Sequence, residues 1–171
     1  AYEQLLEQSL QPGLSAIPNE PLNHLRGFFN VVLYGMTNWG HLLSPRQALL
    51  LHNLSSLIRE EMAEIAKTDD KEFATAVGTI LALCAGKVSQ YNSSCCRWKA
   101  KGETLVDMFG RQAIPMVWDY AEAFPFGKTT GDFSKYLQTA LDVLNKTLEG
   151  TKGTGTAVQA SATEHVLADD S

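Results

Sequence analysis

The tetrapeptide Ser44-Pro45-Arg46-Gln47 constrains the fold most strongly, because it specifies where a long helix begins. A serine can cap the first turn, a proline suits the first helical position, and a glutamine three residues after the serine completes a capping box. Apolar residues then recur at helical spacing to Lys67, and a second helix-patterned segment begins at Thr68 or Asp69. The short polar junction between the two segments predicts an antiparallel helical hairpin. We expect its buried positions to be Leu50, Leu54, Leu57, Ile58 and Ile65 in the first helix, and Phe73, Val77, Ile80, Leu81, Cys84 and Val88 in the second.

Shorter patterns fill the rest of the chain. Residues 1–10 predict a short helix, and the β-branched and aromatic segment 27–35 predicts either a strand or a buried irregular segment. Residues 104–109 predict a short extended piece, and residues 113–124 a helix with a proline tolerated in its first turn. Asp132 can cap a last helix that runs through residue 148. We expect the inward positions of that helix to be Phe133, Leu137, Leu141 and Leu144.

These patterns together predict a mainly α fold, a helical bundle or hairpin with minor short β segments. The length of 171 residues is that of one domain, or of part of one, and is sufficient to bury a hydrophobic core. Residues 1–150 are the helical part. Residues 151–171 are expected to form a flexible linker and a strand, TAVQASA at 156–162.

Composition excludes several classes of protein. The net charge of −5 and the pI of about 5.3 argue against a free-standing, non-specific nucleic-acid binder, because such binding depends on lysine and arginine. No apolar run approaches the ~20 residues that a membrane span needs, and the first residues are not those of a signal peptide, so we expect a cytoplasmic protein without membrane contact. Three cysteines, two of them adjacent, fit a reducing compartment. The four histidines lack metal-ligand spacing, so no metal site is expected.

Residues 90–126 combine many polar side chains with aromatic ones, and helix-patterned segments flank this stretch on both sides. Within it, Arg97, Trp98 and Lys99 form a small basic and aromatic cluster together with Lys101. In a functional interpretation, the tryptophan stacks on a base while the cations contact phosphates. The alternative is a solvated loop with one anchoring indole. The acidity of the whole chain favours this alternative when the cluster is considered alone.

A second polar set lies on or next to the helix predicted at 113–124. Asp119 and Glu122 are three residues apart and would share one face of that helix, so a structural salt-bridge network with Arg111 is the interpretation that spacing alone favours. The other interpretation is a group of residues that organises a binding site. Trp118 lies beside them, and a tryptophan is more often a core residue than a platform for a ligand.

Four blocks of the sequence occur in a distinctive order. They are YGMTNWGHLLSPRQALLL at 34–51, YNSSCCRW at 91–98, FGRQAIPMVWDYAEAFPF at 109–126 and GTAVQASATEHVLADDS at 155–171. Together they resemble blocks of the large adenine-specific DNA methylases that carry an inserted zinc ribbon, and the resemblance covers most of the chain from about residue 18. It implies a parent enzyme that transfers a methyl group from S-adenosylmethionine to the exocyclic amino group of adenine in DNA, in a restriction-modification or phage-defence system.

The resemblance also implies a division of the parent enzyme. The family's Asp/Asn-Pro-Pro-Tyr catalytic motif would follow shortly after Ser171, and the glycine-rich cofactor loop and zinc-ribbon cysteines would precede Ala1. Residues 1–150 would then be a helical insertion in an α/β methyltransferase, and residues 151–171 a linker and strand leading to the catalytic motif. We expect this chain to hold no catalytic residue, to be inactive alone, and not to bind S-adenosylmethionine without the remaining methyltransferase domain.

In this interpretation the insertion either supports the enzyme's structure or recognises its DNA target. We expect Arg97, Trp98 and Lys99 to contact DNA. The residues expected to organise the site are Asn92, Arg111, Gln112, Trp118 and Asp119. The alternative function is a non-catalytic helical module for protein–protein interaction or homodimerisation, in which Trp98 and Trp118 pack against the partner.

Overall fold

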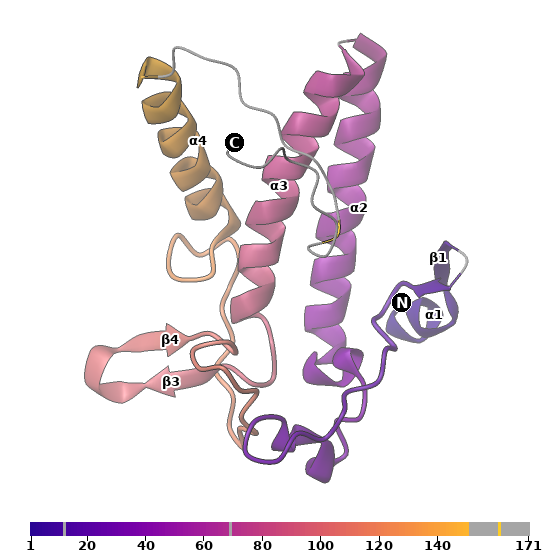
Figure 1. Ribbon diagram of the computed structural model, residues 1–171, viewed down its shortest axis with the longest axis vertical. Helices are drawn as coiled ribbons and strands as arrows, with labels where there is room; N and C mark the ends of the chain where they lie inside the picture. Colours follow the sequence, from indigo (N-terminus) through magenta and orange to yellow (C-terminus); the bar gives the residue numbers. More distant parts are fainter. Residues whose placement is uncertain (12, 69, 151–160, 162–171) are drawn as a thin grey trace.

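The computed structural model describes residues 1–11, 13–68, 70–150 and 161, so the linker and strand predicted at 151–171 fall outside the described residues apart from Ser161. In the described residues the fold is mainly α, as the sequence predicts, with four α-helices and two small antiparallel sheets. Three long helices stand side by side, with α3 in the middle (Figure 1). The helices are α1 (Tyr2–Glu7), α2 (Pro45–Thr68), α3 (Lys71–Tyr91) and α4 (Phe133–Gly150), with 3-10 helices η1 (Asn30–Tyr34), η2 (Trp39–Leu42) and η3 (Ala100–Gly102). The strands are β1 (Ser9–Gln11), β2 (Leu14–Ser15), β3 (Arg97–Lys99) and β4 (Thr104–Val106).

The predicted hairpin of α2 and α3 is present, and local hydrogen bonds explain where its helices begin. The backbone N–H of Ser44 donates to Gln47 Oε1 at 2.8 Å, and the N–H of Gln47 donates to Ser44 Oγ at 3.4 Å, so the capping box forms. At the start of α3, the side chain of Asp70 accepts the backbone N–H of Glu72 at 3.1 Å. The cap of α3 therefore lies slightly later than the sequence predicts.

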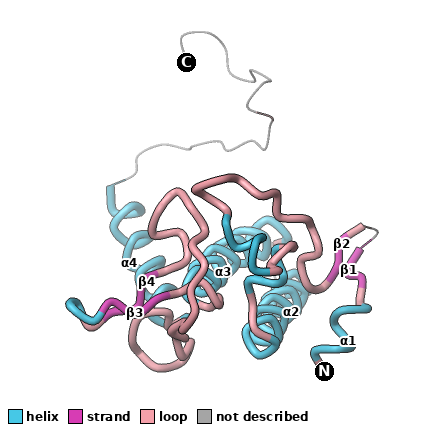
Figure 2. Tube along the Cα trace, turned by 90° about the horizontal axis from the view of Figure 1, so that it is seen from below, coloured by secondary structure: helices cyan, strands magenta, loops and turns pink. Residues whose placement is uncertain are grey.

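Asp132 caps α4, as predicted. Its Oδ2 accepts the backbone N–H of Lys128 at 2.8 Å, and its Oδ1 accepts that of Lys135 at 2.9 Å. These hydrogen bonds lower the pKa of the buried Asp132 carboxyl group below its usual range. Tyr136 of α4 stacks on Tyr91 at the end of α3, with ring centroids 6.4 Å apart. This contact joins the first turn of α4 to α3, and Figure 2 shows α3 between α2 and α4 from below.

Several side chains expected in the core are exposed instead. The long helices form a row rather than a closed bundle, so each apolar stripe is covered where it faces a neighbouring helix and open elsewhere (Figures 1 and 2). α4 also diverges from α3 towards its C-terminal end. The other predicted inward positions of the three helices are buried or half-buried. The expected core residues that are exposed are Leu57, Phe73, Leu141 and Leu144.

The main hydrophobic core lies where α2 begins and α3 ends, among η1, η2 and the loops around them (Figure 1). Residues 27–35 do not form the strand that was one of the two expectations. Their centre is the 3-10 helix η1, which ends at Gly35 in the left-handed conformation with φ 90°. The buried members of this core are Leu22, Val31, Leu42, Cys95 and Ile114.

The helix predicted at residues 113–124 does not form, and this segment is irregular. The backbone N–H of Ile114 donates to the carbonyl of Phe28 at 2.9 Å, and the N–H of Ala121 donates to the carbonyl of Cys96 at 3.0 Å. Pro115 also disfavours helical backbone at the residue before it. Contacts with distant parts of the chain therefore replace the hydrogen bonds that a local helix would have made.

The expectation that no segment could span a membrane needs one correction, which concerns α3. Among the described residues, α3 alone is long and apolar enough by length and composition, with a mean hydropathy of 1.3. Only 22% of this apolar window is buried, although α3 packs between α2 and α4, and single helices that meet the same criterion also occur in soluble proteins. The pattern is therefore weak evidence for a membrane helix.

Candidate functional site

β3 and β4 form a hairpin that extends sideways from the base of the helices (Figure 1). The extended piece predicted at residues 104–109 corresponds to β4, whereas β3 was not predicted. The turn contains η3 and ends at Glu103, whose φ of 44° is left-handed. The antiparallel register pairs Arg97 with Val106, Trp98 with Leu105, and Lys99 with Thr104.

The hairpin is anchored by residues 92–96, here called the root, which connect α3 to β3 and are buried except for one half-buried serine. Ser93 Oγ donates to the carbonyl of Leu42 at 3.0 Å and accepts the backbone N–H of Cys95 at 3.1 Å. Burial raises the pKa of the Cys96 thiol to about 11, so this side chain stays uncharged at neutral pH. The root thus fixes the hairpin to η2 and the main core.

Residues 97–103, here called the tip, are exposed throughout. The indole of Trp98 is 57% exposed. The ion pairs of the described residues involve other cations, so Arg97, Lys99 and Lys101 have no carboxylate within salt-bridge distance there. The tip therefore presents an aromatic face and three cations that are available to an anionic ligand.

A hollow of about 180 Å³ lies beside the hairpin, and both Arg97 and Arg111 line it. The fold thus brings together two predicted residues, one from β3 and one from the loop after β4. Asp107 lines the same hollow, and its charge offsets part of the positive charge of the two guanidinium groups. The rest of the wall consists of Cys95, Met108, Gly110, Pro115, Met116 and Val117.

The other residues expected to organise the site are not gathered around this hollow. Asn92 is buried at the end of α3, where its Nδ2 donates to the carbonyl of Val88 at 3.0 Å. Trp118 is 79% exposed, so it is not a core residue, and it meets the ring of Tyr34 edge to face with centroids 5.6 Å apart. Gln112, just before the irregular segment, and Asp119 within it are both exposed.

The salt-bridge network expected among Arg111, Asp119 and Glu122 is absent from the described residues, because the helix that would align these side chains does not form. Glu122 pairs instead with Arg46 of α2, whose Nε donates to Glu122 Oε2 at 2.7 Å. This hydrogen bond raises the pKa of Arg46. The two residues are 76 positions apart, so sequence spacing provides no signal for their contact.

A second hollow of about 410 Å³, here called the amide cavity, was also missed by sequence reasoning. Gln47 and Asn92, each only 1% exposed, are among its lining residues, together with Phe124 and Phe126. These residues come from the start of α2, the end of α3 and the irregular segment. Only the helix-capping role of Gln47 could be recognised from the sequence.

Among the described residues, no group of three or more histidine, cysteine, aspartate or glutamate side chains is placed to hold a metal ion. Comparisons of the chain with protein-family models, with curated proteins and with solved structures find no match. A functional proposal therefore depends on the geometry of the hairpin and on the sequence blocks themselves.

Proposed function

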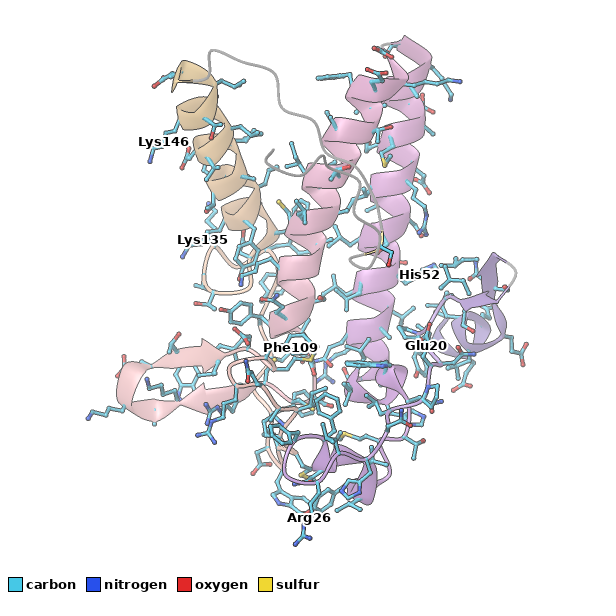
Figure 3. The ribbon with its side chains drawn as sticks, in the orientation of Figure 1. Glu20, Arg26, His52, Phe109, Lys135 and Lys146 are labelled. Atoms are coloured by element: carbon cyan, nitrogen blue, oxygen red, sulfur yellow. The ribbon has the colours of Figure 1, made fainter. Side chains whose placement is uncertain are left out.

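We propose that this chain is a helical insertion of an adenine-specific DNA methyltransferase and that its β3–β4 hairpin contacts DNA. The observation that supports the contact is the tip, which carries an exposed indole among cations that lack carboxylate partners in the described residues. The side chains of the hairpin stand clear of the helices (Figure 3). An exposed indole can stack on a base, and lysine and arginine bind phosphate oxygens. The four sequence blocks support the assignment to a methyltransferase.

In this proposal the remaining methyltransferase domain performs the chemistry, with S-adenosylmethionine as the source of the methyl group. The described strands form only two hairpins, which offer no edge of a parallel sheet where such a nucleoside cofactor would bind. We propose that the insertion itself contributes neither a catalytic residue nor a cofactor site. We place the enzyme in the cytoplasm, as part of a restriction-modification or phage-defence system.

The charge distribution gives the hairpin a specific task. The whole chain has a net charge of −5, so most of its surface repels the phosphate backbone. Arg97, Lys99, Lys101 and Arg111 outnumber Glu103 and Asp107 in and beside the hairpin. This local excess of positive charge would attract DNA to the hairpin and orient the duplex relative to the catalytic domain.

Fluorescence anisotropy with a labelled duplex at low salt tests the contact. We expect Trp98→Ala to weaken binding of a duplex that carries one unpaired base about 5- to 100-fold, the effect of losing one stacked aromatic, because paired bases offer no free face. Lys99→Ala is expected to reduce the slope of log K against log salt by about one. The matched control is Lys146→Ala, because Lys146 lies on α4, far from the hairpin (Figure 3). Absence of duplex binding at low salt, or an equal loss with the control, would refute the proposal.

The methyltransferase assignment needs the intact enzyme. Transfer of a labelled methyl group to DNA is expected to fall with Trp98→Ala or Arg111→Ala, because each variant weakens or misplaces the duplex. Circular dichroism should show that both variants remain folded, since both side chains are exposed. If both variants methylate DNA at the wild-type rate, the site assignment is wrong.

An apolar groove between α3 and α4 favours a second candidate function, a protein–protein interaction module. The groove has a volume of about 450 Å³, and Leu83, Val143 and Leu144 line it with exposed side chains. Exposed apolar surface of this kind marks contact sites. Sedimentation velocity decides between the two functions. A tight homodimer that Leu83→Lys dissociates would support the module, whereas a monomer that binds DNA would support the insertion.

A further inference from the structure

The amide cavity lies between the start of α2, the end of α3 and residues 122–126, and none of its lining residues belongs to the hollow beside the hairpin. Its volume of about 410 Å³ is within the range of small-molecule sites. Such sites combine apolar walls with a few polar groups that fix the orientation of a ligand. The cavity contains both kinds of group.

Gln47 provides the observation that points to a ligand. Its side chain is only 1% exposed, and its Oε1 accepts the backbone N–H of Ser44 at 2.8 Å. This hydrogen bond fixes the orientation of the amide, because only the oxygen can accept. Nε2 is buried and has no hydrogen-bond partner in the described residues. Buried polar groups in folded proteins almost always have partners, so this donor, in a residue that lines the cavity, can be satisfied by a ligand that accepts a hydrogen bond.

Aromatic and acidic groups define the rest of the ligand. Phe124 and Phe126 are 66% and 60% exposed, and their rings meet edge to face with centroids 5.9 Å apart. Exposed rings at the wall of a cavity favour stacking of a flat ring. The carboxylate of Glu122, held by Arg46, lines the same cavity and accepts hydrogen bonds from amino groups.

We infer that the amide cavity binds a planar heteroaromatic ring of the nucleobase class. An acceptor on the ring edge takes the hydrogen bond from Gln47 Nε2, and an amino group on the same ring donates to Glu122. Because Nε2 has almost no accessible surface, the ring reaches it only if a side chain of the wall shifts, and Phe124 and Phe126 are the exposed aromatic side chains there. This inference goes beyond the proposed DNA contact, because it concerns a cavity separate from the hairpin. A free nucleoside and an unpaired base in DNA both contain such a ring.

Two probes separate these sources. Calorimetry with adenosine measures binding of a free nucleoside, and anisotropy compares a duplex carrying one unpaired adenine with the fully paired duplex. Gln47→Glu keeps the oxygen that accepts from Ser44 but replaces the amide donor with a second acceptor. The matched control is Gln4→Glu, which makes the same change at an exposed position on α1. Leu50→Trp fills the cavity and provides a second test that leaves the capping box intact.

We expect Gln47→Glu to weaken binding about tenfold, the factor contributed by one ordinary hydrogen bond, while Gln4→Glu has no effect. A loss for adenosine indicates a free nucleoside, and a loss confined to the duplex with the unpaired adenine indicates a base in DNA. The inference is overturned if adenosine does not bind and the duplex with the unpaired adenine binds no better than the paired duplex, or if Gln47→Glu and Leu50→Trp both bind as the wild type does. Binding of adenosine without any duplex binding would refute the DNA contact alone.

Discussion

The root and the tip of the hairpin are adjacent in sequence and opposite in environment. Asn92, Ser93, Cys95 and Cys96 are at most 1% exposed, whereas every residue from 97 to 103 is exposed. The root is joined by hydrogen bonds to η2 and packs in the main core, and the tip makes no ion pair among the described residues. This contrast indicates a division of tasks, in which the root holds the fold together and the tip is free to bind. Substitutions in the two regions should therefore affect different measurements.

The largest expected effect is on the core that surrounds the root. Ile114 is buried in the same cluster as Cys95, and Ile114→Ala should lower the free energy of unfolding by about 2–5 kcal/mol, because it removes buried methyl groups and leaves a cavity. Val143→Ala, at an exposed position on α4, should change it by at most about 0.5 kcal/mol. Urea unfolding followed by circular dichroism measures both values. Equal costs for the two variants would contradict the view that the root region stabilises the fold.

A hydrogen bond within the root should have the next largest effect. Ser93→Ala leaves the buried backbone N–H of Cys95 without its acceptor, and an unsatisfied buried donor costs about 1–3 kcal/mol. The matched variant is Ser94→Ala, whose hydroxyl donates to the Leu42 carbonyl at 2.9 Å. After Ser94→Ala, the Leu42 carbonyl still accepts a hydrogen bond from the backbone N–H of residue 94. This substitution should therefore lower the free energy of unfolding by less than Ser93→Ala in the same urea experiment. The reverse order would show that the Ser93 hydroxyl is not the anchor of the root.

Local chemistry explains which parts of the fold the sequence could predict. Ser44 and Gln47 form their capping box within four residues, and Asp132 caps α4 through neighbouring N–H groups. The hairpin of α2 and α3 follows from apolar spacing and a short junction. Each of these features depends on residues that are close in sequence, so propensity and spacing were sufficient.

The parts that could not be predicted depend on contacts between distant residues. Residues 113–124 have a helical pattern, but Ala121 bonds to Cys96, and Glu122 pairs with Arg46. The amide cavity requires Gln47 and Phe124 to meet after folding, and no spacing rule relates them. The cluster around Trp98 was found because it is contiguous in sequence. Its projection from the body was not predictable, since it depends on how the root is buried.

Asp132, which caps α4, is a second anchored residue outside the root. The pH dependence of its effect on stability tests the contrast between anchored and exposed residues. Hydrogen bonds to the N–H groups of Lys128 and Lys135 lower the pKa of Asp132 in the folded chain. The stabilisation by its carboxylate is therefore complete above the unfolded pKa of about 4 and is lost as the pH falls through the folded value. Asp132→Asn should lower the melting temperature at pH 7, and the gap from the wild type should close towards pH 2. Asp132→Asn should lower the free energy of unfolding by less than Ser93→Ala does, because the asparagine amide oxygen can still accept one hydrogen bond. Asp142→Asn, at an exposed position on α4, should show no such gap, and a gap that persists at pH 2 would refute the account.

The smallest expected effect on stability is at the tip, and it decides between the two interpretations of the tryptophan. If the indole of Trp98 anchors a loop, Trp98→Ala should destabilise the fold by more than about 1 kcal/mol, because a large packed side chain is lost. The 57% exposure of Trp98 indicates the other result, a change within about 0.5 kcal/mol in urea unfolding. A variant that keeps its stability and loses DNA affinity would assign the indole to binding. A destabilised variant that binds DNA as the wild type does would assign it to the fold, and the contrast between root and tip would then fail at its central residue.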